Sequence, residues 1–129
     1  MLALGLDVGT TGVKGILIDA GGTMVAEATA PHDLHSPRPG WAEEDPAAWW
    51  SGVCAVCHEL IGRTPGGAEA IAAIGVSGMV PAIVLLDEAD EPLRPSIQQN
   101  DARAHAEVDE LRDALDQDAV LARSGSVTT

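Results

Sequence analysis

The chain has 129 residues, enough for one domain with a single hydrophobic core. It carries 7 Lys and Arg against 20 Asp and Glu, a net charge of −13, and so acidic a surface repels nucleic-acid phosphates and anionic lipid headgroups. There is no basic leader, no apolar stretch of membrane-spanning length, and only two cysteines. We therefore expect a reduced, cytoplasmic protein with no nucleic-acid or membrane partner.

The first thirty residues predict three short strands in a meander, from the apolar runs 2–6, 13–18 and 23–30. The first run is continuously apolar, as in a strand that is buried on both faces. The connection after the second run contains Gly21 and Gly22, and paired glycines take the positive φ that a type I′ hairpin turn needs. The connection between the first two runs, residues 7–12, is longer and polar.

A helix is predicted to begin after Asp45, which suits the N-cap, with Pro46 at the first helical position. Its inner face is indicated by apolar residues at spacings of four, three and four: Trp49, Val53, Val56 and Leu60. Two further strands are predicted at 71–76 and 82–86, and a second amphipathic helix from about residue 101 to 115. This order of elements favours an α/β layered fold.

The strongest candidate site is the polar segment between the first two strands, with the pattern Asp7-x-Gly9-Thr10-Thr11-Gly12-x-Lys14. Glycines let a backbone approach a polyphosphate, hydroxyls and an ammonium bind its oxygens, and an aspartate holds the water shell of Mg²⁺. Lys14 is the only lysine in the chain. A strand rather than a helix follows, so the segment is not a Walker A loop. We predict an ATP-phosphate and magnesium site here.

A competing pattern is Cys54-x-x-Cys57-His58, which matches a covalent haem attachment site. Haem attachment of this kind needs export, and no export signal precedes the motif. The spacing instead predicts that both thiols lie along the inner side of the first helix, so a haem protein is a distant alternative.

Four segments carry a resemblance to known proteins. Residues 7–14 are similar to the phosphate-binding hairpin of the actin, hexokinase and heat-shock-chaperone ATPase superfamily. Residues 40–50, 71–87 and 93–103 resemble, in order, the Gly-Trp-x-Glu-x-Asp-Pro segment, a strand pair and the Asn-Asp-x-Arg run of FGGY carbohydrate kinases. The resemblance implies a ribonuclease-H-like α/β fold, with a mixed five-stranded sheet and flanking helices. Residues 1–129 would form the N-terminal part of the first of two lobes.

The resemblance also implies the function: transfer of a phosphoryl group from ATP, with Mg²⁺, to a hydroxyl of a sugar or polyol. Asp7 would position a Mg²⁺-bound water as the catalytic residue of this chain, and the ATP phosphates would be bound by Gly9, Thr10, Thr11, Gly12 and Lys14. The general base of the family lies in the second half, so this chain alone is expected to be inactive. The full-length enzyme is expected to form a homodimer.

Substrate contacts are implied for Val80, Pro81, Gln99, Asn100, Asp101 and Arg103. Xylulose kinases commonly carry a Met-His pair where this chain has Val80 and Pro81, and the family tryptophan before Asn-Asp is Gln99 here. These departures predict that xylulose is not the preferred sugar. A related activating or reactivating ATPase, or a non-catalytic nucleotide-binding remnant, remains an alternative. A reading frame that continues into a Gly-rich segment with an aspartate would favour the kinase.

Overall fold

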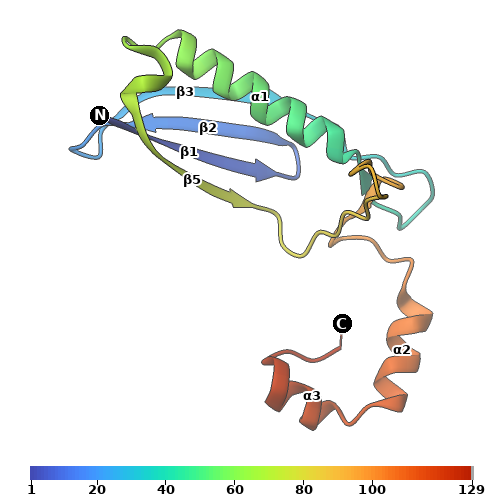
Figure 1. Cartoon of the computed structure of the whole chain (residues 1–129). Helices are drawn as coiled ribbons and strands as arrows, with labels where there is room; N and C mark the ends of the chain where they lie inside the picture. The colour runs from blue at the N-terminus through green and yellow to red at the C-terminus, as the bar shows by residue number, and fades with distance from the viewer. Residues whose placement is uncertain (129) are drawn as a thin grey trace.

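The computed structural model describes residues 1–128 and shows a mixed sheet with one long helix on one face (Figure 1). The sheet contains β1 (Leu2–Gly9), β2 (Gly12–Ile18), β3 (Met24–Pro31) and β5 (Ile71–Gly78), and the long helix is α1 (Pro46–Gly62). The smaller elements are β4 (Glu43–Glu44), a 3₁₀ turn (Gly67–Ala70), β6 (Ser96–Ile97), α2 (His105–Ala114) and α3 (Gln117–Ser124).

The strands of the sheet lie in the order β3-β2-β1-β5. The first three form the antiparallel meander that the sequence predicts, and β5 runs parallel to β1 after the α1 crossover. The register places Asp7 opposite Lys14 on β2 and Ser77 on β5. The α/β class with a mixed sheet is thus confirmed.

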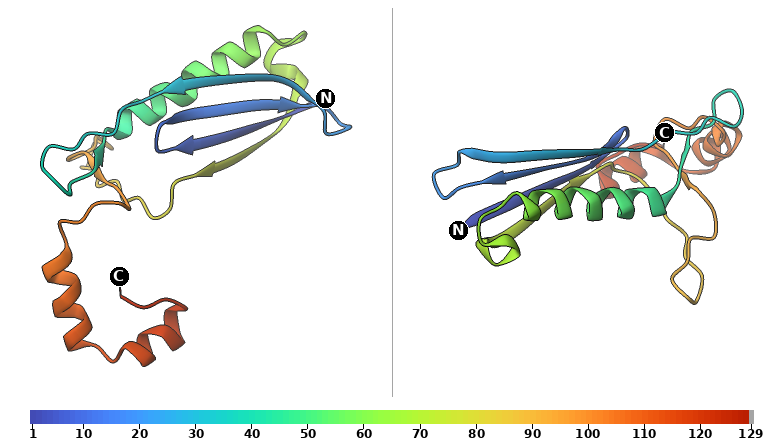
Figure 2. Two further views of the ribbon diagram at one scale, coloured as in Figure 1. Left: turned by 180° about the vertical axis from the view of Figure 1, so that it is seen from behind. Right: turned by 90° about the horizontal axis from the view of Figure 1, so that it is seen from above.

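The core lies between this sheet and α1, which covers β2 and β3 (Figure 2). The predicted N-cap is confirmed, because Oδ1 of Asp45 accepts a hydrogen bond of 2.9 Å from the Ala47 amide. Val56 and Leu60 of the helix are buried against Val13 and Leu17 of β2. Such a core of small aliphatic side chains needs close backbone packing, and the glycines of β2 and α1 provide it.

The turn between β2 and β3 differs from the type I′ prediction. Only Gly22 has a positive φ, of 81°, and its amide donates to the Asp19 carbonyl at 3.0 Å. The Asp19 carboxylate accepts from the amides of Gly21 and Thr23 at 2.8 and 2.9 Å. The Asp19 side chain thus stabilises a turn in which only the last residue, Gly22, has a left-handed conformation. This arrangement is typical of a three-residue hairpin loop.

The predicted fifth strand at 82–86 is wrong for residues 1–128, where the main sheet has four strands. The segment makes only isolated bridges, from Ile83 to Ile97 and from Leu86 to Pro92. Proline at 92 and at 95 removes backbone donors from the returning chain, so a regular ladder cannot form. Residues 79–99 instead form an irregular loop, in which only β6 (Ser96–Ile97) is a strand, and β6 pairs with β4.

The second predicted helix begins later than expected, and a further short helix that was not predicted follows it. α2 starts at His105, because the Asp101 side chain holds the Arg103 amide at 2.9 Å in a turn outside the helix. Asp116 then caps α3. Neither helix has a buried residue, and both stand away from the sheet (Figures 1 and 2). Among the described residues, no helix is both long enough and apolar enough to span a membrane.

Candidate active site

The β1–β2 hairpin is tighter than the sequence indicates. The strands continue to the Gly9–Gly12 pair, so only Thr10 and Thr11 lie in the turn. Both threonines are exposed at the end of the sheet. Gly12 has a φ of 153°, and a Cβ built on it would lie 2.6 Å from the carbonyl oxygen of Ala30. Glycine is required here because β3 passes directly against the hairpin.

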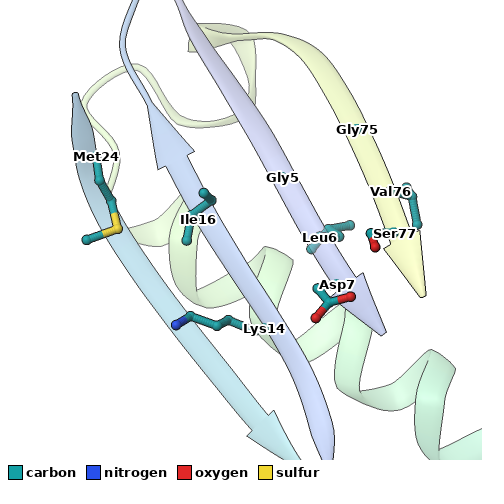
Figure 3. Close-up of a pocket in the computed structure, with 9 residues that line it drawn as sticks. All are labelled: Gly5, Leu6, Asp7, Lys14, Ile16, Met24, Gly75, Val76 and Ser77. Carbon is teal, nitrogen blue, oxygen red and sulfur yellow. The ribbon is translucent and has the colours of Figure 1, made fainter. Parts of the chain in front are cut away.

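Asp7, Lys14 and Ser77 share the face of the sheet opposite α1 (Figure 3). They line a shallow depression of about 630 Å³, whose floor consists of small or apolar residues, among them Gly5, Ile16 and Gly75. Sequence reasoning did not single out Ser77. The signal was available, because Ser77 directly follows the apolar run 71–76, and the carboxyl ends of parallel strands meet at one edge of a sheet.

The charges of this depression suit an anion with a bound metal. The Asp7 carboxylate is exposed and makes no hydrogen bond within residues 1–128, and its Oδ2 lies 3.8 Å from a Cβ built on Gly9. Lys14 Nζ lies 3.6 Å from Glu27 Oε2, and both side chains are more than half exposed. An exposed pair of this kind contributes little stability, so Lys14 can exchange Glu27 for a phosphate oxygen.

Asp7 is the residue here that can serve Mg²⁺. The described residues contain no group of three His, Cys, Asp or Glu side chains that would hold a metal ion alone. Magnesium in nucleotide sites usually keeps several waters and uses one or two carboxylates with the substrate phosphates. A single unengaged carboxylate beside a glycine-bearing hairpin fits that requirement.

The predicted acceptor residues Asp101 and Arg103 lie together in a hydrogen-bonded cluster. The Asp101 side chain is 2% exposed and binds the Arg103 guanidinium through two hydrogen bonds, of 2.6 and 2.8 Å. It also accepts from the Ala42 amide at 2.6 Å. The hydrogen bonds from Arg103 lower the pKa of Asp101 far below its usual value, against the opposing effect of burial. The same bonds raise the pKa of Arg103.

Four further residues belong to this cluster. Glu43 Oε1 accepts hydrogen bonds from Arg103 and from Arg94, each at 2.7 Å. The guanidinium carbon Cζ of Arg103 lies 3.7 Å from the centroid of the Trp41 ring, and Cζ of Arg38 lies 4.9 Å from the same centroid. Asp101 and Arg103 therefore have their polar groups largely satisfied within the protein, which fixes the segment that carries Gln99 and Asn100.

The other predicted acceptor residues are exposed. Val80 is 79% exposed, and the peptide bond between Val80 and Pro81 is cis. Pro81 and Gln99 line one depression of about 450 Å³ with apolar walls, distinct from the one that contains Asp7. The loop that carries Val80 starts beside the hairpin, because the Met79 amide donates to the Val8 carbonyl at 3.1 Å. Asn100 is exposed at the rim of the Asp101 cluster.

The cysteines of the haem-like pattern belong to α1. Cys57 packs against the core, and burial, together with the neighbouring Cys54, raises the pKa of its thiol. Both thiols are free. A thiol with a raised pKa is a poor nucleophile and metal ligand, so Cys57 behaves as part of the hydrophobic packing, while Cys54 is half-buried beside it.

Comparison with known proteins shows the family of the chain. Residues 2–129 match the family model described as the FGGY family of carbohydrate kinases, N-terminal domain. A xylulose kinase of Lactococcus lactis is 32% identical over 88% of this chain and 23% of its own length. A glycerol kinase of Methylorubrum extorquens is 36% identical over 93% of this chain and 22% of its own length.

Among solved structures, a xylulose kinase from Rhodospirillum rubrum is 49% identical and superimposes with a TM-score of 0.90, over 100% of this chain and 26% of that one. The chain thus spans about a quarter of the length of the relatives that it matches. Since the family model covers nearly every residue, the chain belongs to the FGGY family of carbohydrate kinases, in the N-terminal domain.

Proposed function

We propose that this chain supplies the ATP-phosphate hairpin and part of the acceptor cleft of a kinase that phosphorylates a sugar or polyol hydroxyl. The observation that carries the proposal is the placement of Asp7, Lys14 and Ser77 on three adjacent strands beside the Thr10–Thr11 turn. Family membership supports it, because the relatives above are named as xylulose and glycerol kinases.

These residues would position the phosphates of ATP and neutralise the negative charge that they carry. Phosphoryl transfer spreads negative charge over the transferred group, and fixed cations and donors stabilise it. Lys14 would contribute a positive charge, and Thr10 and Thr11 would contribute hydroxyl and amide donors. Asp7 would orient a water of the Mg²⁺ shell, and the ion would neutralise the charge that develops between the phosphates.

On the acceptor side, Val80, Pro81, Gln99 and Asn100 would form the wall that the sugar or polyol contacts. Asp101 and Arg103 would hold this wall in place, because their polar groups are already engaged with each other and with Glu43. The expected homodimer stays a prediction for the complete enzyme.

The decisive experiment is an assay of the complete protein for acceptor-dependent ADP release with Mg-ATP. The panel contains D-xylulose, other pentuloses and hexuloses, glycerol and other polyols. We expect one acceptor class to stimulate turnover, and chelation of Mg²⁺ to abolish it. ATP hydrolysis that no acceptor stimulates would instead support a related ATPase, and absence of nucleotide binding would support a remnant. The 129-residue chain alone should release no ADP.

A further inference from the structure

A buried polar trio lies between the end of β3, β4 and the first turns of α1. Glu44 of β4 is fully buried, and its Oε2 accepts a hydrogen bond of 2.6 Å from the Trp49 indole N–H. The same oxygen lies 3.6 Å from Nδ1 of His32, whose side chain is 4% exposed. Within residues 1–128, both His32 ring nitrogens and Glu44 Oε1 lack a hydrogen-bond partner. A carboxylate and an imidazole buried in this way are costly to keep.

The position of His32 connects the trio to the phosphate hairpin. His32 directly follows β3, whose last residue, Pro31, pairs with Gly12. Its amide donates a hydrogen bond of 3.3 Å to the carbonyl of Thr11, in the hairpin turn. The His32 backbone therefore supports the turn, while its side chain is held against Glu44. A path of direct contacts runs from α1 through Glu44 and His32 to Thr11.

Glu43, the other residue of β4, faces the opposite way. Successive side chains of a strand point to opposite sides, and Glu43 binds Arg94 and Arg103 while Glu44 binds Trp49. β4 thus contacts His32, which supports the phosphate hairpin, on one side. On its other side it contacts Arg94 and Arg103, beside the predicted acceptor residues.

We propose that Glu44 is a positioning residue for the phosphate hairpin, acting through His32, and that Glu43 has the same role for the acceptor segment. Neither carboxylate lines the depression that contains Asp7 or the one that contains Pro81 and Gln99. β4 thereby sets the distance and angle between the bound phosphates and the hydroxyl that receives the phosphoryl group. Phosphoryl transfer is sensitive to that alignment. The kinetic meaning of this proposal rests on the proposed kinase function, whereas its structural part does not.

The structural part is tested on the 129-residue chain by ¹H–¹⁵N NMR. Glu44→Gln keeps the shape of the side chain and removes its charge. We expect the Trp49 indole resonance to move upfield and the Thr11 and His32 amides to shift, with the guanidinium N–H resonances of Arg103, whose Nη1 binds Glu43, unchanged. Glu43→Gln should give the reverse pattern. Glu59→Gln, an exposed carboxylate paired with Arg63 on α1, is the matched control and should move none of these resonances.

Trp49→Phe gives an independent test should Glu44→Gln fail to fold, as judged by circular dichroism. It removes only the indole donor to Glu44, and the His32 and Thr11 amides should again shift. Hairpin amides that stay in place in every folded variant would overturn the proposal, whether or not the complete protein is a kinase.

The kinetic part is tested in the complete protein. Glu44→Gln should raise the KM for Mg-ATP several-fold and leave the KM for the acceptor unchanged, while Glu43→Gln should do the opposite. A general structural defect would lower kcat or move both KM values together. Equal effects of the two variants on both substrates would overturn the division of roles between Glu43 and Glu44.

Discussion

Gly15 of β2 lies against Leu60 of α1 with no room for a methyl group between them. A Cβ built on Gly15 would lie 2.9 Å from Leu60 Cδ1 and closer still to Val56 Cγ1. Gly15→Ala should therefore lower the free energy of unfolding by about 1–3 kcal/mol, through overpacking. Urea unfolding measures this. Gly75→Ala is the control, since its Cβ would meet nothing within 4 Å; equal losses in both variants would contradict the packing argument.

Asp7→Asn should lower kcat of the complete protein for the proposed phosphoryl transfer by about a hundredfold or more, because a neutral amide orients the Mg²⁺ water shell poorly. Stability should hardly change, since the Asp7 side chain is exposed and unengaged in residues 1–128. Steady-state kinetics and thermal unfolding measure the two effects. Asp33→Asn removes an exposed carboxylate elsewhere and should leave both unchanged. Near-normal turnover of Asp7→Asn would remove this residue from the mechanism.

Asp101→Asn should destabilise the fold in a pH-dependent manner. The pKa of Asp101 is lowered in the folded state, chiefly by its hydrogen bonds with Arg103, so its stabilising effect is complete above the unfolded-state pKa of about 4. It declines as the pH falls from there towards the folded-state pKa. The stability difference between wild type and Asp101→Asn, from urea unfolding, should thus be largest near neutral pH and shrink below about pH 4.

Asp109→Asn provides the matched control for this pH dependence. Its side chain is 75% exposed on α2 and lies 3.5 Å from Arg112. An exposed pair of this kind contributes little, so the control should show a small difference at every pH. A constant difference for Asp101→Asn across the pH range would contradict the assigned role of its charge.

If the complete protein is the proposed kinase, it should use D-xylulose less well than another ketose or polyol, because Val80 and Pro81 offer no side-chain hydrogen bond to a sugar hydroxyl. The double change Val80→Met and Pro81→His should raise kcat/KM for D-xylulose relative to glycerol. Pro65→His, which lies beyond α1 at the other end of the sheet, should not. Coupled ADP release measures all three proteins, and a wild-type preference for D-xylulose would contradict the prediction.

The sequence predicted the features whose cause is local. The β1–β2–β3 meander follows from three apolar runs separated by turn residues, and α1 follows from the Asp45 cap and its apolar spacing. The segment 82–86 has an equally apolar composition, but it is flanked by Pro81 and is followed by a return through Pro92, and it does not join the sheet.

The candidate site also contains some residues that a local sequence pattern reveals and others that only tertiary packing brings together. Asp7 and the hairpin residues are contiguous, so their pattern is visible in the sequence. Ser77 joins them only through the parallel pairing of β1 with β5. The pairing of His32 with Glu44, and the binding of Arg103 by Glu43, join residues that are 12 and 60 positions apart. Such contacts depend on tertiary packing, which no local pattern encodes.

The two edges of the sheet differ in how well they are protected. β3 carries the charge of Glu27 and ends in Pro31, and both features discourage another strand from pairing there. β5 has neither a charged residue nor a proline, and its residues Ile74 and Val76 are 64% and 71% exposed. Of the two edges, β5 is therefore the one better suited to pair with a further strand.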